Sequence, residues 1–186
     1  MKKKIIITGG LGYIGTELCR LYSGVSWHHK ILVFDNRFIS ERVNQIRNWN
    51  MEFIHGDILD EDLVNKYFSN ADVVHHLAGI TSVPRTKSES SKKIDEKIKL
   101  VAEEGTQKIL NTISNKCKLI FPSTHVVYEG IPEVKKDIKE NENTQPVLSY
   151  SSSKAVNEKQ IKDSRKNYVI LRLGSVYGYS NDTMRI

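Results

Sequence analysis

The chain has 186 residues, which is enough for one domain with a sizeable core. Hydrophobic residues make up 39% of it and charged residues 27%, as in ordinary globular proteins, and no apolar run approaches the ~20 residues needed to cross a membrane. The net charge of +6 is scattered without a nucleic-acid-binding pattern, so we expect anionic small-molecule ligands and no nucleic acid.

Short β-branched runs alternate with longer helical patterns along the chain. The expected strands cover residues 4–8, 31–35, 51–55, 72–77, 118–122 and 168–173. The expected helices cover residues 12–22, 61–68, 91–113 and 149–165, with Ser149 as the N-cap of the last one, and a polar surface loop is expected at 135–145. Strands that alternate with helices are typical of parallel sheets, so the sequence predicts an α/β fold, a Rossmann-type doubly wound parallel sheet.

A glycine-rich turn joins the first expected strand to the first expected helix and reads TGGLGYIG over residues 8–15. Glycine leaves room for the close approach of a pyrophosphate, whose charge would lie on the free N–H groups of the helix. Two spacings fit, Gly10-x-Gly12-x-x-Gly15 and Gly9-x-x-Gly12-x-x-Gly15. The turn alone therefore predicts a dinucleotide without identifying it.

An acidic residue at the end of the second expected strand favours NAD over NADP. Asp35 follows Gly15 by 20 residues, where a carboxylate accepts hydrogen bonds from the adenosine ribose and repels a 2′-phosphate. Arg37 could bind such a phosphate, but we interpret it as a solvated loop charge because Asp35 precedes it. Residues 56–58 are expected to hold the adenine, and the small residues at 77–79 would let the cofactor lie close to the backbone.

A tyrosine and a lysine four residues apart, Tyr150 and Lys154, share one face of an expected helix. A nearby ammonium and the positive charge of an oxidised nicotinamide lower the pKa of a phenol, which makes tyrosine a usable base. Such a pair is also common on ordinary helix surfaces. It gains weight here because the preceding strand ends near Thr124, whose hydroxyl would point into the crevice at the ends of parallel strands.

Several motifs occur in a set order along nearly the whole chain: TGGLGYIG at 8–15, Asp35, GDI at 56–58, HLAG at 76–79, GT at 105–106, PSTHVVYE at 122–129, YSSSK at 150–154 and LRLGSVYG at 171–178. In this combination the chain resembles the N-terminal domain of an extended short-chain dehydrogenase/reductase, of the NAD-dependent epimerase/dehydratase type. The resemblance implies NAD as cofactor and a nucleotide sugar as substrate.

The resemblance also implies residue roles. Thr124 would hydrogen-bond the reacting oxygen, and Tyr150 would take the sugar hydroxyl proton while hydride passes to NAD. Lys154 would lower the pKa of Tyr150 and bind the nicotinamide ribose, and Arg172 would be structural. The residues implied to bind the cofactor are Gly9, Gly12, Tyr13, Ile14, Gly15, Asp35, Asn36, Asp57, Ile58, Leu77, Ala78, Gly79 and Lys154.

Some residues depart from the family pattern. Dehydratases of the family carry an Asp-Glu pair after the position of Thr124, whereas this chain has His125 and Val126. Without those carboxylates the sequence favours a nucleotide-sugar epimerase. A reductase or dehydratase of the same family and a non-catalytic NAD-binding module are the alternatives. Glu129 also stands where the family usually has glycine.

The resemblance divides the chain into an NAD-binding Rossmann domain at 1–178 and the start of a truncated substrate-binding region at 179–186. The C-terminal substrate domain is then largely absent, and we expect a fragment of a larger enzyme. The helices at 91–113 and 149–165 could form a homodimer, although the apolar face of the first could equally be core.

The cysteines and histidines predict no special chemistry. Cys19 and Cys117 form no pair and no secretory signal precedes them, which favours a cytoplasmic protein. The adjacent histidines at 28–29 and 75–76 are not spaced to share a metal ion, so we expect no metal site.

Overall fold

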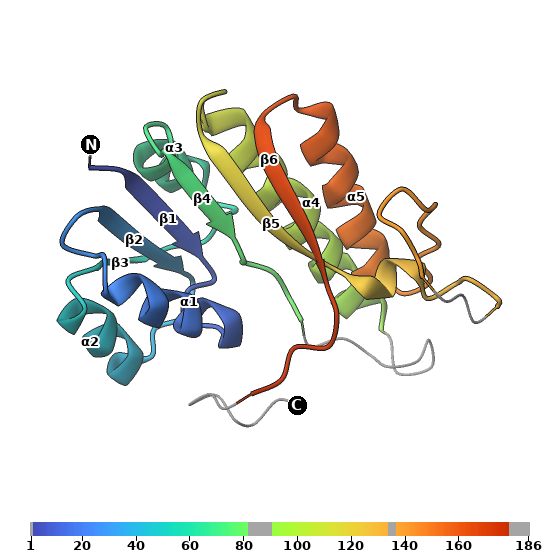
Figure 1. Cartoon of the computed structure of the whole chain (residues 1–186), viewed down its shortest axis with the longest axis horizontal. Helices are drawn as coiled ribbons and strands as arrows, with labels where there is room; N and C mark the ends of the chain where they lie inside the picture. The colour runs from blue at the N-terminus through green and yellow to red at the C-terminus, as the bar shows by residue number, and fades with distance from the viewer. Residues whose placement is uncertain (1, 82–90, 134–136, 179–186) are drawn as a thin grey trace.

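The computed structural model describes residues 2–81, 91–133 and 137–178. Within these residues six parallel strands form one sheet in the order β3-β2-β1-β4-β5-β6 (Figure 1). The strands are β1 (Lys4–Thr8), β2 (Lys30–Asp35), β3 (Glu52–His55), β4 (Val73–His76), β5 (Lys118–Thr124) and β6 (Asn167–Leu173). The predicted parallel sheet is confirmed, with strand ends that differ from the expected ones by no more than two residues.

The helices are α1 (Tyr13–Ser23), α2 (Ser40–Asn48), α3 (Glu61–Phe68), α4 (Lys92–Thr112) and α5 (Ser149–Asp163), and the short 3₁₀ helix η2 (His125–Tyr128) follows β5. The sequence did not predict α2 or η2. Only Val43 and Ile46 are buried in α2, so its polar sequence lacks a strong apolar period. The expected N-cap of α5 was wrong: Leu148 occupies that position, and Ser149 is the first helical residue.

The helices cover both faces of the sheet because successive strand residues point to opposite sides. Ile5, Ile7 and Val33 pack with residues of α1 and α2, such as Cys19 and Val43. The alternate positions face the other side, where α3, α4 and α5 lie (Figure 1). The doubly wound arrangement that the sequence predicted is therefore confirmed.

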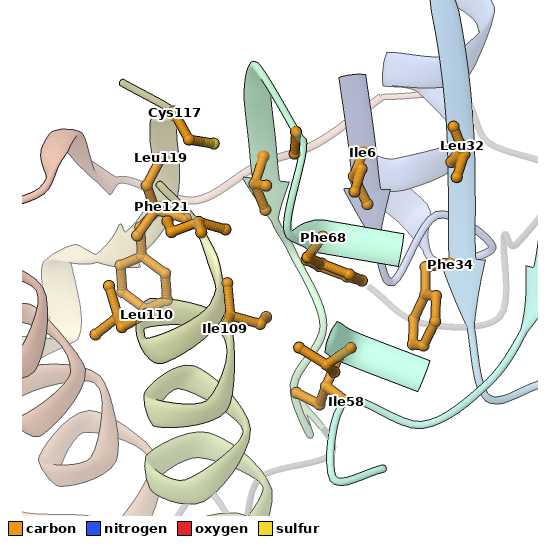
Figure 2. Close-up of a cluster of buried hydrophobic side chains, with 14 of the residues drawn as sticks. Ile6, Leu32, Phe34, Ile58, Phe68, Ile109, Leu110, Cys117, Leu119 and Phe121 are labelled. Carbon is orange, nitrogen blue, oxygen red and sulfur yellow. The ribbon is translucent and has the colours of Figure 1, made fainter. Parts of the chain in front are cut away.

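The larger core lies between the sheet and the helices α3, α4 and α5. Figure 2 shows Phe34 of β2 and Phe68 of α3 meeting there, with their ring centroids 5.3 Å apart and edge to face. Ile109 and Leu110 of α4 pack into the same core. The apolar face of α4 is therefore core, one of the two readings that its sequence allowed.

The strand order reverses between β1 and β4. From β1 the chain adds β2 and β3 on one side, and from β4 it adds β5 and β6 on the other. In sheets of this kind the carboxyl ends of the strands at such a reversal enclose a ligand crevice. The chain after β6 returns toward this point, because the Tyr13 hydroxyl donates to the carbonyl oxygen of Gly178 at 2.9 Å (Figure 1). The predicted region 179–186 lies outside the described residues. In the part of the chain that the structure describes, no helix is long and apolar enough to span a membrane.

Candidate active site

A cleft of about 660 Å³ opens where the strand order reverses. Every residue that the sequence singled out for the cofactor or for catalysis lines it. From the glycine turn and the neighbouring strand ends come Gly9, Gly12, Tyr13, Ile14, Gly15, Asp35, Asn36, Asp57, Ile58, Leu77, Ala78 and Gly79, and from β5 and α5 come Thr124, Tyr150 and Lys154. Segments far apart in the sequence thus share one cleft.

The glycine turn leaves no room for side chains on its inner surface. Gly9 has a φ of 64°, and a Cβ there would lie 2.8 Å from the main-chain nitrogen of Ala78. A Cβ on Gly15 would overlap the carbonyl oxygen of Gly9. Gly12 is the N-cap of α1 and offers no side-chain acceptor, so the first N–H groups of the helix stay available to an anion. These residues fit a dinucleotide pyrophosphate.

Asp35 ends β2 and lies almost fully buried at the edge of the cleft. Its Oδ2 accepts the main-chain N–H of Leu11 at 2.9 Å, and its Oδ1 accepts that of Arg37 at 2.9 Å. Arg37 is an exposed loop residue, as expected, but it is also paired with Asp35, which the sequence did not predict. Its Nε atom lies 3.2 Å from Asp35 Oδ1, because the turn after β2 brings the guanidinium back over the buried carboxylate.

The end of β3 contributes a second acidic residue beside Asp35. Asp57 accepts a hydrogen bond from Asn36 Nδ2 at 2.9 Å and another from the main-chain N–H of Leu59 at 2.9 Å. Ile58 is buried next to it. The loop after β3 is therefore tied to the end of β2 through Asn36 and Asp57, both of which the sequence had assigned to the same site.

A buried chain of hydrogen bonds supports the opposite wall and was not expected from the sequence. The main-chain N–H of Ala78 donates to Thr8 Oγ1 at 3.0 Å, and His76 bridges Thr8 and Thr106 with both ring nitrogens at 3.0 Å. Desolvation first, and then the charge of Lys154, lower the pKa of His76 to about 3. His76 is therefore neutral, and through Thr8 it supports the segment after β4 that includes Ala78.

The three residues proposed for catalysis lie where the carboxyl end of β5 faces the N-terminal turn of α5. Thr124 ends β5, and Tyr150 and Lys154 lie one turn apart at the start of α5. Lys154 Nζ lies 5.9 Å from the centroid of the Tyr150 ring and 4.5 Å from that of Phe121. Its hydrogen bond goes to the carbonyl oxygen of Pro122 at 2.9 Å.

The protein alone does not lower the pKa of Tyr150; the sequence-based expectation was that the Lys154 ammonium and an oxidised nicotinamide would lower it together. Burial raises it above its ordinary value, because the phenolate is poorly solvated there. Burial also lowers the pKa of Lys154 to about 8, against the opposing effect of Glu158. A lysine that is itself poorly solvated and bound to Pro122 does not outweigh the desolvation of the phenol.

Glu129 fixes the start of the helix that carries Tyr150. Its Oε1 accepts the main-chain N–H groups of Val147 at 2.8 Å and Leu148 at 2.7 Å, and it also binds the Ser151 hydroxyl. A carboxylate at a helix N-terminus is stabilising. The departure from the glycine usual in the family therefore has a structural role in this chain.

The cleft also includes residues that the sequence had not singled out. Lys97, Leu100 and Val101 line it from one face of α4, at the i, i+3 and i+4 spacing that could have indicated a second wall. His125 and Val126 do not line it, although they stand where dehydratases carry their acidic pair. No cluster of histidine, cysteine or acidic residues among the described positions could hold a metal ion.

The chain also resembles proteins of known function. It matches the NAD dependent epimerase/dehydratase family over residues 5–186. A dTDP-D-glucose 4,6-dehydratase from Dictyostelium discoideum is 31% identical over 95% of this chain and 44% of its own length. A UDP-glucose 4-epimerase from Neisseria meningitidis serogroup C is 29% identical over 88% of this chain and 49% of its own length.

Solved structures agree with these relatives. The UDP-glucuronic acid 4-epimerase from Bacillus cereus in complex with NAD superposes with a TM-score of 0.76 at 28% identity, over 94% of this chain and 57% of that one. The UDP-glucose 4-epimerase from Brucella ovis in complex with NAD gives 0.73 at 27% identity, over 91% of this chain and 51% of that one. The chain thus spans about half the length of these relatives, and it belongs to the NAD dependent epimerase/dehydratase family.

Proposed function

We propose that this chain is the cofactor-binding and catalytic half of an NAD-dependent nucleotide-sugar epimerase. The observation that carries the proposal is the single cleft that holds the glycine turn, Asp35, Thr124, Tyr150 and Lys154. NAD complexes among the structural relatives support the cofactor. The division into a dinucleotide domain at 1–178 and the start of a substrate region at 179–186 is part of the proposal.

In the proposed reaction Tyr150 takes the proton of a sugar hydroxyl as the C–H bond at that carbon breaks. The hydride acceptor and donor for this carbon would be bound NAD, held by the glycine turn, Asp35 and Lys154. Thr124 hydrogen-bonds the reacting oxygen, and Lys154 holds the nicotinamide ribose. Because burial alone raises the pKa of Tyr150, the positive charge of the oxidised nicotinamide is needed to bring the phenol toward neutral pH.

A dehydratase is disfavoured by the residues after Thr124. Elimination of water needs an acid and a base beside the sugar, and this chain has His125 and Val126 where dehydratases of the family carry an Asp-Glu pair. His125 instead contacts the carbonyl oxygen of Leu173 at 3.2 Å. The first relative named above is a dehydratase, so this local departure rather than overall identity favours the epimerase.

The assembly and location stay predictions. Asn157 Nδ2 of α5 donates to the carbonyl oxygen of Ala102 in α4 at 2.9 Å, so the two helices pack within one chain. The same helices expose Ile94 and Val156, which supports a homodimer through them. Light scattering at several concentrations would test it. The free, buried Cys19 and Cys117 fit the predicted cytoplasmic location.

The decisive experiment compares Tyr150→Phe with wild type in the full-length protein. We expect NAD binding to persist and epimerisation of nucleotide sugars to be lost, whereas Tyr168→Phe on exposed β6 keeps both. Unchanged biological activity of Tyr150→Phe with intact NAD binding would instead favour a non-catalytic module. A full-length protein that carries no NAD and changes no nicotinamide absorbance with nucleotide sugars would refute the epimerase.

A further inference from the structure

The Asp35 carboxylate is saturated by groups of its own chain. Two of its hydrogen bonds come from main-chain N–H groups, those of Leu11 and Arg37. The other two come from the Arg37 side chain, with Nε 3.2 Å from Oδ1 and Nη2 3.4 Å from Oδ2. Two carboxylate oxygens accept about four hydrogen bonds, so none of that capacity remains for a ligand.

The guanidinium also covers the position that a ligand would use. The side chain of Asp35 is 3% exposed and that of Arg37 is 46% exposed, so the arginine lies between the carboxylate and solvent. Both residues line the cleft. Arg37 Nη2 lies only 3.6 Å from where a Cβ on Gly12 would be, which places it over the glycine turn.

Of the four hydrogen bonds, only those from the Arg37 side chain can be exchanged without moving the backbone. The Leu11 and Arg37 N–H groups belong to the turns after β1 and β2 and hold the carboxylate in place. The two side-chain hydrogen bonds are also the longer ones, at 3.2 and 3.4 Å against 2.9 Å for the main-chain pair, and the arginine that donates them is half-exposed, so it can rotate into solvent.

We propose that Arg37 is a latch on the dinucleotide site, which occupies Asp35 in the free protein and must release it before the adenosine ribose can bind. This inference rests on the proposed function, since it assumes that a dinucleotide uses the cleft. Once released, the guanidinium would still lie at the same cleft, two residues after Asp35, and so near the position proposed for the ribose. While it is paired with Asp35, the guanidinium opposes the binding of NAD, which needs the carboxylate. As a cation at this position, it favours a 2′-phosphorylated dinucleotide.

The test measures NAD binding to the 186-residue chain by calorimetry, for wild type and for Arg37→Met, which keeps side-chain length and removes the donors. We expect the NAD dissociation constant to fall about threefold, as the loss of one half-exposed and weakly bound competitor would allow. Arg47→Met removes an exposed arginine at the end of α2 and should leave the NAD dissociation constant unchanged. An unchanged or higher dissociation constant in Arg37→Met overturns the latch.

Two further measurements separate the latch from other effects of charge. In an Asp35→Asn background, Arg37→Met should bring no gain, because the carboxylate that both compete for is gone. NADP should bind Arg37→Met no better than wild type, since the variant has lost the partner of the 2′-phosphate. Equal tightening of NAD and NADP would mean that Arg37 merely fills the cleft, and would overturn the proposal. A wild-type chain that binds neither dinucleotide would refute the proposed function itself, and the latch with it.

Discussion

Arg172 of β6 donates two hydrogen bonds to Glu158 of α5, from Nε to Oε1 at 2.9 Å and from Nη2 to Oε2 at 2.7 Å. The carboxylate side chain is 3% exposed and the guanidinium 14%. Ser123, next to Thr124, also donates to Glu158 Oε1 at 2.7 Å. These hydrogen bonds join β6, α5 and β5, so Arg172 has the structural role that the sequence predicted.

Arg172→Met is expected to lower the free energy of unfolding by about 3 kcal/mol, because it leaves the buried Glu158 carboxylate without its main partner. Lys159→Met removes one side of an exposed pair with Asp163 and should cost less than about 0.5 kcal/mol. Urea denaturation of both variants measures the difference. Equal costs would mean that the buried pair adds no more than a surface pair.

Lys154 should make stability depend on pH in the alkaline range. Burial lowers its pKa from 10.5 to about 8, so between these values the unfolded chain holds a proton that the folded chain has released. Unfolding free energy then rises with pH. This contribution is complete above pH 10.5 and is lost as the pH falls through about 8.

Lys154→Met removes that titration and is therefore expected to have its largest stability advantage over wild type below pH 8, with the gap narrowing as the pH rises. Thermal or urea unfolding at several pH values measures it. Lys99→Met removes a solvent-exposed lysine and should give a curve parallel to that of wild type. A gap between wild type and Lys154→Met that does not change with pH would contradict the predicted desolvation.

Glu129 should make stability depend on pH in the acid range. Burial alone would raise its pKa, but the hydrogen bonds from Ser151, Leu148 and Val147 lower it below the ordinary value of 4.5. A lowered carboxyl pKa contributes stability above pH 4.5 that disappears as the pH falls through the folded-state pKa.

Glu129→Gln is therefore expected to cost about 1 kcal/mol at pH 7, the size of a lost N-cap interaction, and almost nothing relative to wild type in acid. Unfolding by urea at pH 7 and at pH 3 would measure both values. Glu133→Gln, at an exposed position in the loop before α5, provides the matched comparison. If the cost of Glu129→Gln is the same at both pH values, the charge of the carboxylate is not what holds the helix.

What the sequence predicted well was local. The glycine turn, Asp35, and the Tyr150–Lys154 pair each follow from spacing within one strand–helix unit, and parallel strands bring their carboxyl ends to one edge. The same reasoning placed the strands, because β-branched runs alternate with longer periodic segments. The cleft lining therefore contains every residue expected there.

What the sequence missed depends on pairs distant in the chain or on competition for one partner. Arg37 pairs with Asp35 because the carboxylate is buried, and burial cannot be read from two neighbouring charges. Glu129 reaches Leu148 across 19 positions, so its departure from the family pattern could be noticed but not explained. The raised pKa of Tyr150 likewise reflects desolvation by the assembled fold.

The glycine turn offers the sharpest test of the site's construction. A Cβ on Gly15 would overlap the carbonyl oxygen of Gly9 and crowd the Gly10 backbone, which cannot move aside as a flexible side chain could. Gly15→Ala is therefore expected to destabilise the chain by about 1–3 kcal/mol, the usual cost of overpacking, and to abolish NAD binding at concentrations where wild type is saturated.

Gly24→Ala is the matched control, because Gly24 ends α1 with a φ of −64° and the nearest atom to its Cβ would be 4.0 Å away. It should leave NAD binding intact and raise stability by up to about 1 kcal/mol through the unfolded state. Calorimetry and urea unfolding measure both quantities. A Gly15→Ala chain that binds NAD like wild type would show that the pyrophosphate does not lie on this turn, since the displaced backbone is the surface proposed to hold it.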